Sequence, residues 1–211
     1  MRHVKLPHPP LLIITDRTQA HARLDDVLAD AFAAGCRWAS VREKDLPPGD
    51  QVALAQRLLR VARDWDAILT LHGDPKLAQA ATLDGVHLAA GDDAVAARAL
   101  LGHGDLIGLS VHSVADAAKL DPSMVDYAIA GPTYATTSKP DYGPPLGMLG
   151  IGRIADATRV PIVAIGGITA QAVAELRVAG AAGIAVMGGV MRSMDPKGEV
   201  KRLIAALSAR D

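Results

Sequence analysis

The sequence is poor in aromatic residues and has almost no net charge, and both shortages exclude nucleic-acid binding. Aromatic side chains make up 3% of the 211 residues, which leaves no platform on which single-stranded nucleic acid could stack. The formal net charge is −1, so no broad basic surface is expected. With 50% hydrophobic and 21% charged residues, the composition is typical of a globular protein with a core of Ala, Val, Leu and Ile.

Cysteine and long apolar runs are also scarce. Cys36 is the single cysteine and lies in the apolar run AAGCRWASV, so it forms no internal disulfide and is interpreted as a buried structural thiol. No stretch reaches the roughly 18 consecutive apolar residues of a membrane span. The N-terminal residues MRHVKLPHPP lack the apolar region of a signal peptide. These features predict a cytoplasmic protein without membrane contact.

Short apolar runs alternate along the chain with segments of helical spacing. The runs do not alternate with polar residues, which is typical of strands buried on both faces. They are Leu11–Thr15, Trp38–Arg42, Ala67–Leu71, Gly85–Leu88, Leu106–Ser110, Tyr127–Gly131, Pro161–Ile165 and Gly183–Met187. The segments 24–32 and 52–62 place apolar residues three and four positions apart, as a helix requires. Val173, Leu176 and Val178 indicate a further helix. Thr169 is expected to cap the last of these helices.

This alternation predicts a single (β/α)8 TIM barrel over residues 1–211. An open doubly wound sheet is the alternative, but the eight runs and the absence of an early GxGxxG motif favour the barrel. No linker, charge run or low-complexity tract divides the chain into domains. Active sites of such barrels lie at the C-terminal ends of the strands, and here those ends are polar, cationic and rich in glycine.

Two glycine doublets close the last two predicted strands, in AIGGI (164–168) and VMGGV (186–190). Glycine allows a backbone to approach a ligand closely. TIM barrels often hold a phosphate at the loops after strands seven and eight, where helix N-termini add positive potential. The alternative is that the glycines only form tight turns. We expect a phosphate-binding cradle that includes Gly166, Gly167 and Gly188.

The run VREKD, at the end of the second predicted strand, supplies two cations. Arg42 and Lys44 alternate, so both are expected to face the barrel mouth while Glu43 points away. Two cations at this place suit a polyanionic ligand. The alternative is an ordinary solvated turn.

Acidic and histidine side chains complete the candidate set. Asp92 and Asp93 follow the fourth strand, and a carboxylate beside cations suggests Mg²⁺ bridged to phosphates. The alternative is that Asp92 caps the helix at 94–101. His87 lies within a strand and is interpreted as a packed core residue. His112 lies just after a strand end and is a candidate for ligand binding or proton transfer. No zinc spacing, serine triad or P-loop is present.

A long loop, GPTYATTSKPDYGPPLG (131–147), separates two apolar runs. Its four prolines and three glycines exclude a helix or a central strand. Loops of this length in compact proteins are usually functional or disordered.

These motifs together resemble the thiamine phosphate synthase family, which includes thiazole tautomerases as divergent relatives. The resemblance covers nearly the whole chain and rests on LLIITDR, VREKD, GVHL followed by Asp92, GLSVHS, the long loop, VPIVAIGGI and AGAAGIAVMGGV. The family's synthases join hydroxymethylpyrimidine diphosphate to thiazole phosphate and release pyrophosphate, with Mg²⁺. The resemblance therefore implies small phosphorylated pyrimidine and thiazole substrates, Mg²⁺ as cofactor, and a homodimer.

The resemblance also assigns residues to parts of this reaction. The loop expected to close over the substrates contains Thr136, Ser138 and Lys139, and Lys139 contacts pyrophosphate. Positions for pyrophosphate and Mg²⁺ are matched by Arg42, Lys44, Ser110 and Asp92. The cradle for the thiazole phosphate is matched by Gly167, Met187 and Gly188, and Gly166 is kept beside them as a candidate substrate-binding residue.

The sequence departs from the family's synthases at two places. They carry glutamine two residues before the arginine of the second-strand motif, where this chain has Ser40. They carry Asn-Asp after the third strand, where this chain has His72-Gly73, and the missing aspartate is a Mg²⁺ ligand in the family. Asp74 lies one residue too late to replace it. Ser40 and His72 are kept as candidate substrate-binding residues.

Two alternatives to a synthase follow from these departures. A glycine after the third strand also resembles the tautomerase branch, but that branch uses a histidine just after the sixth strand, where this chain has Pro132. The second alternative is a non-catalytic regulator that binds thiazole phosphate or thiamine phosphate.

Overall fold

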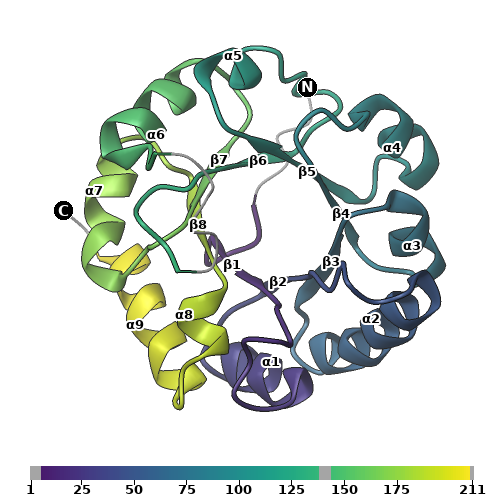
Figure 1. Ribbon diagram of the computed structural model, residues 1–211. Coiled ribbons are helices and arrows are strands. Elements are labelled where there is room, and N and C mark those ends of the chain that lie inside the picture. The colour runs from purple at the N-terminus through teal and green to yellow at the C-terminus, as the bar shows by residue number, and fades with distance from the viewer. Residues whose placement is uncertain (1–5, 138–143, 210–211) are drawn as a thin grey trace.

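The computed structural model describes residues 6–137 and 144–209, which contain a closed barrel of eight parallel strands (Figure 1). The strands are β1 (Leu11–Ile14), β2 (Trp38–Val41), β3 (Ile68–His72), β4 (Gly85–Leu88), β5 (Leu106–Val111), β6 (Tyr127–Ala130), β7 (Ile162–Ile165) and β8 (Gly183–Val186). β1 pairs with β2 on one side and with β8 on the other, which closes the ring. The predicted (β/α)8 barrel is confirmed, and every predicted strand agrees within one residue at each end.

Helices surround the ring of strands. The last helices, α8 and α9, lie beside the first helix, α1, where the end of the chain returns to its beginning (Figure 1). The helices are α1 (Leu24–Ala33), α2 (Pro48–Arg63), α3 (Pro75–Ala80), α4 (Ala94–Leu101), α5 (Val114–Ala117), α6 (Gly147–Asp156), α7 (Val173–Val178), α8 (Gly188–Met191), α9 (Pro196–Ser208) and the 3₁₀ turn η1 (Ala170–Ala172). Among the residues described, no helix combines the length and the apolar character that crossing a membrane requires.

Two hydrophobic clusters follow from the alternation of side chains along the strands. The larger cluster lies between strands and helices and includes Cys36, whose burial is confirmed and raises the pKa of its thiol to about 12. The smaller cluster fills the barrel and includes Trp38 and Tyr127, whose rings meet edge to face at 4.7 Å. Both rings come from the first residues of their strands, so they fill the N-terminal end. The C-terminal end of the barrel is not filled by these rings and is available to a ligand.

One prediction about the helices is wrong, one alternative is excluded, and one apolar residue lies outside the buried faces. Val178 is 75% exposed and does not belong to the buried face of α7. Thr169 precedes the turn η1 and makes no side-chain capping hydrogen bond. Asp93, and not Asp92, caps α4, because its Oδ1 accepts a hydrogen bond from the Ala96 N–H at 2.9 Å.

Candidate active site

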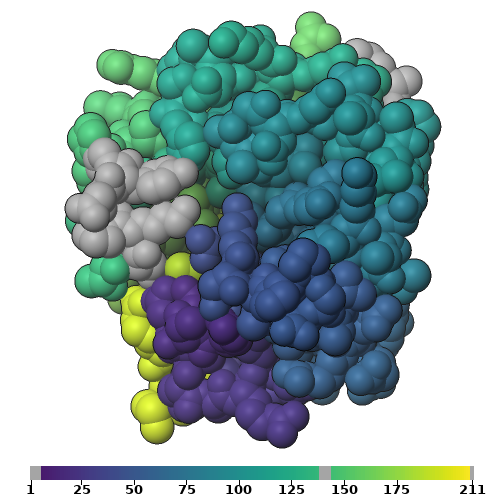
Figure 2. Space-filling model, turned by 45° about the vertical axis from the view of Figure 1, so that its right-hand side comes forward, coloured from purple at the N-terminus to yellow at the C-terminus, as the bar shows by residue number. Residues whose placement is uncertain are grey.

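The C-terminal ends of the strands surround a cavity of about 360 Å³, which we call the barrel-mouth cavity. In the space-filling view the surface is hollowed between the blue atoms of the N-terminal third and the teal atoms of the middle of the chain (Figure 2). The candidate residues that line this cavity are Arg42, His72, Ser110, Thr136, Gly166, Gly167, Met187 and Gly188. The fold therefore brings together candidate residues from six different strand ends and the loops that follow them.

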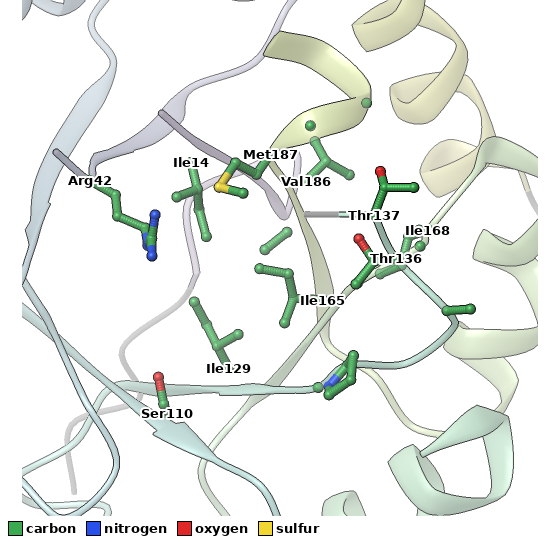
Figure 3. Close-up of a pocket in the computed structure, with 18 of the residues that line it drawn as sticks. Ile14, Arg42, Ser110, Ile129, Thr136, Thr137, Ile165, Ile168, Val186 and Met187 are labelled. Atoms are coloured by element: carbon green, nitrogen blue, oxygen red, sulfur yellow. The ribbon is translucent and has the colours of Figure 1, made fainter. Parts of the chain in front are cut away.

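The barrel-mouth cavity has an apolar middle and polar ends. Ile14, Ile129 and Ile165 lie between Arg42 and Ser110 on one side and the loop threonines on the other (Figure 3). An apolar middle with a few convergent polar groups is the usual design of a small-molecule site. The cavity thus suits a flat apolar ligand that carries charged groups at its ends.

A second, more open cavity of about 790 Å³ adjoins the first, and His72 lines both. Lys44, Gly73 and Asp92 line this second cavity but not the barrel-mouth cavity. Desolvation lowers the pKa of Lys44, and the positive charge of Arg42 lowers it further. Arg42 and Lys44 thus face neighbouring cavities, and their charges influence each other across the boundary.

Glu43, between these two cations, is buried and connects the ends of β1 and β2. It is 3% exposed, and its Oε1 accepts a hydrogen bond from Thr15 Oγ1 at 2.8 Å. The backbone N–H of Arg42 in turn donates to Thr15 Oγ1 at 2.9 Å. Burial raises the pKa of Glu43, while its hydrogen bonds to Thr15 and Arg17 oppose the rise. Glu43 points away from the mouth as predicted, and it fixes the backbone from which Arg42 extends.

Ser110 is held from inside the barrel by His87. The imidazole Nε2 and Ser110 Oγ are 2.9 Å apart. His87 is 0% exposed, which confirms the prediction of a core residue, and desolvation followed by the charge of Lys44 lowers its pKa to about 3. The imidazole is therefore neutral at physiological pH. The rings fit because position 108 is glycine: an added Cβ would lie 2.5 Å from His87 Nδ1 and also overlap Tyr127.

The long loop is anchored at both ends of its described part. The Thr133 N–H donates to the Ile165 carbonyl at 2.7 Å, and the Gly147 N–H donates to the Thr133 carbonyl at 2.8 Å. Thr136 and Thr137 then line the barrel-mouth cavity (Figure 3). The predicted contacts of Ser138 and Lys139 lie outside the described residues.

Gly167 allows the long loop to approach the end of β7. Its φ is +63°, and an added Cβ would lie 2.5 Å from the Ala135 carbonyl oxygen and 2.9 Å from Tyr134 Cβ. We expect Gly167→Ala to lower the free energy of unfolding by about 1–3 kcal/mol, because the left-handed backbone is strained for alanine and the loop must move. Urea unfolding measures this, with Gly104→Ala as the matched control, since nothing lies within 4 Å of a Cβ there. Equal losses in both variants would contradict the prediction.

The remaining candidates occupy different surroundings. Ser40 is 0% exposed and lines neither cavity. His112 lines the barrel-mouth cavity, with its Nδ1 3.0 Å from the Gly131 carbonyl oxygen. Arg192, just after α8, also lines this cavity and was not among the residues predicted from sequence. No motif singled out Arg192, although its position four residues after Gly188 places it on the same side of α8.

Comparison with known proteins agrees with this geometry. The thiamine monophosphate synthase family model matches residues 11–190, which include all eight strands. The chain belongs to this family. It is 39% identical to the thiamine-phosphate synthase of Methanoculleus marisnigri over 95% of this chain and 93% of that protein. It is 35% identical to the thiamine-phosphate synthase of Roseiflexus sp. over 93% of this chain and 84% of that protein.

A solved structure extends the likeness to three dimensions. The thiamine phosphate pyrophosphorylase from Pyrococcus furiosus superposes with a TM-score of 0.82, at 27% sequence identity, over 93% of this chain and 94% of that chain. The resemblance to the thiamine phosphate synthase family, inferred from the motifs, is thus confirmed.

Gly73 and Asp74 follow β3, where the resemblance to the family leads us to expect an aspartate. Gly73 has a φ of +150°, a conformation that other residues rarely adopt, although nothing lies within 4 Å of a Cβ at this position. Asp74 caps α3, and its Oδ1 accepts a hydrogen bond from the Lys76 N–H at 2.8 Å. Gly73 therefore offers no carboxylate, whereas the carboxylate of Asp74 lines the second cavity while it caps α3.

Proposed function

We propose that the protein is a thiamine-phosphate synthase, which joins hydroxymethylpyrimidine diphosphate to thiazole phosphate and releases pyrophosphate. The observation that carries the proposal is one apolar cavity with Arg42 and Ser110 on one side and the glycine doublets on the other. Two flat heterocycles fit the apolar middle. The diphosphate belongs on the side of Arg42, which borders Lys44, and the thiazole phosphate belongs at the glycines.

The reaction needs stabilisation of the leaving group more than a nucleophilic side chain. Negative charge grows on pyrophosphate as its bond to the pyrimidine methylene carbon breaks, and fixed cations stabilise such charge strongly in a site that excludes water. Arg42 and Lys44 are placed for this role, and Lys139 would add a third charge from the loop. Closure of the loop over the substrates would keep water from the carbon that is attacked by the thiazole nitrogen.

His87 determines how Ser110 acts on the diphosphate. A hydroxyl has a single proton, so Ser110 donates it to a phosphate oxygen only when His87 donates its own proton to Ser110 Oγ. Neutral His87 does this when its proton is on Nε2, which lies 2.9 Å from Ser110 Oγ. The buried imidazole thus orients Ser110 toward the diphosphate without placing a positive charge in the core.

The second cavity offers carboxylates that fit Mg²⁺, and Asp92 is the candidate ligand because Asp74 and Asp93, which also line this cavity, cap α3 and α4. Asp92 lines the second cavity together with Lys44, and its Oδ2 is oriented by the Ala89 N–H at 2.8 Å. Within the described residues no group of three His, Cys, Asp or Glu side chains is placed to hold a metal. Mg²⁺ commonly takes one or two carboxylates and completes its shell with water and substrate phosphates. Bound in this way, the ion neutralises part of the diphosphate charge.

Product formation tests the proposal directly. We expect purified protein with both substrates and Mg²⁺ to form thiamine phosphate and pyrophosphate in equal amounts, and we expect EDTA to abolish both. Isomerisation of the thiazole phosphate without condensation would instead support the tautomerase alternative. In that case His112, which lines the cavity, would be the candidate for proton transfer. Tight binding of thiazole phosphate with no turnover would support the regulator alternative. We also propose a cytoplasmic homodimer, which analytical ultracentrifugation and cell fractionation would test.

A further inference from the structure

We propose that Arg192 binds the phosphate group of the thiazole substrate and is the charged partner of the glycine cradle. This inference rests on the proposed function and adds to it the side chain that distinguishes the phosphorylated thiazole from its free alcohol.

The position of Arg192 is the first support. Its side chain folds back from the end of α8 over Gly188, where an added Cβ would lie 2.6 Å from Nη2 and 2.7 Å from Cζ. Gly188 is therefore the residue that lets the guanidinium lie against the backbone of the cradle. Arg192 lines the barrel-mouth cavity together with Gly167, Gly188 and Gly189.

The charges around the cavity are the second support. Arg42 and Arg192 are the arginines among the described residues that line it, and no aspartate or glutamate is among those residues. Arg42 extends from the end of β2, and Arg192 follows the glycine doublet 188–189 after β8. A phosphate monoester carries close to two negative charges at neutral pH, which backbone N–H groups neutralise only in part. A planar guanidinium binds phosphate with two parallel hydrogen bonds, so Arg192 supplies the missing charge.

A neutral side chain holds Arg192 in place. Its Nη1 donates a hydrogen bond to Gln19 Oε1, and Gln19 Nε2 donates to Asp16 Oδ2. These hydrogen bonds orient the guanidinium at the cavity wall. The competing explanation is that Arg192 has only a structural role and connects α8 to the loop after β1.

Steady-state kinetics distinguish a phosphate-binding role of Arg192 from a purely structural one. We expect Arg192→Gln to raise the KM for thiazole phosphate about 10-fold, the effect of losing a hydrogen bond to a charged group. The KM for hydroxymethylpyrimidine diphosphate should change less than about twofold, because that substrate binds at Arg42. Arg192→Lys should recover part of the loss, since the charge remains but the paired hydrogen bonds do not. Arg202→Gln is the matched control, because Arg202 pairs with Glu199 on α9.

Ligand binding tests the inference even if the proposed function fails. In calorimetric titrations we expect the native protein to bind thiazole phosphate more tightly than the unphosphorylated thiazole alcohol, and Arg192→Gln to lose most of this preference. Gln19→Leu should give a smaller loss of the same kind. An equal loss of affinity for both ligands in Arg192→Gln would show a purely structural role and overturn the inference. An unchanged preference for the phosphorylated ligand would overturn it as well. Absence of thiamine phosphate formation would overturn the proposed function alone.

Discussion

Replacing Arg42 with glutamine is expected to lower kcat/KM for thiamine phosphate formation by about 100- to 1,000-fold, the usual cost of removing one preorganised group that stabilises transition-state charge. The backbone from which the guanidinium extends is held in place, because the Arg42 N–H donates to Thr15 Oγ1, which donates to Glu43 in turn. No reorganisation of the strand end is needed when charge develops on the leaving pyrophosphate. Glutamine keeps much of the side-chain volume and removes the charge.

Steady-state kinetics with each substrate varied in turn measures this effect. Arg60→Gln is the matched control, because Arg60 lies on the exposed side of α2 and lines neither cavity. Thermal unfolding of both variants should agree with that of the native protein, which would exclude a loss of folding. A decrease of less than about fivefold, or an effect confined to the KM for thiazole phosphate, would contradict the placement of the diphosphate at Arg42.

The sequence predicted the barrel and most of its mouth because these depend on local patterns. Each strand is a short apolar run bounded by turn residues, so its position follows from composition alone. One glycine doublet follows β7 directly and the other follows β8 after Met187, and the order of the strands then places them at the mouth. The long loop could be predicted because its prolines exclude a helix or a central strand.

Contacts between distant segments could not be predicted in this way. Arg42 and Lys44 line different cavities because β2 ends at Val41, and the alternation of side chains applies only within a strand. The pairing of His87 with Ser110 depends on the register of β4 and β5, which no single segment encodes. Arg192 is separated from Gln19 by nearly the whole chain, and closure of the barrel brings them together.

Acid is expected to destabilise the protein through His87. In the unfolded chain the histidine has its ordinary pKa of 6.5, whereas desolvation followed by the charge of Lys44 lowers the pKa in the folded protein to about 3. Between these values the unfolded chain binds a proton that the folded protein does not. The contribution of His87 to stability is therefore complete above about pH 6.5 and is lost progressively as the pH falls toward 3.

The expected size is about 2–3 kcal/mol of unfolding free energy lost between pH 6.5 and 4.5, since each pH unit in this window costs about 1.4 kcal/mol. Urea unfolding at several pH values measures it, and His87→Gln should flatten the dependence because glutamine does not titrate. His103→Gln is the matched control, since His103 is exposed. If His87→Gln and the native protein lost stability equally between pH 6.5 and 4.5, the acid sensitivity would belong to other groups. A flattened profile would instead show that the core keeps His87 neutral. In this state Nε2–H can donate to Ser110 Oγ, so that the Ser110 hydroxyl can donate its own proton to the diphosphate.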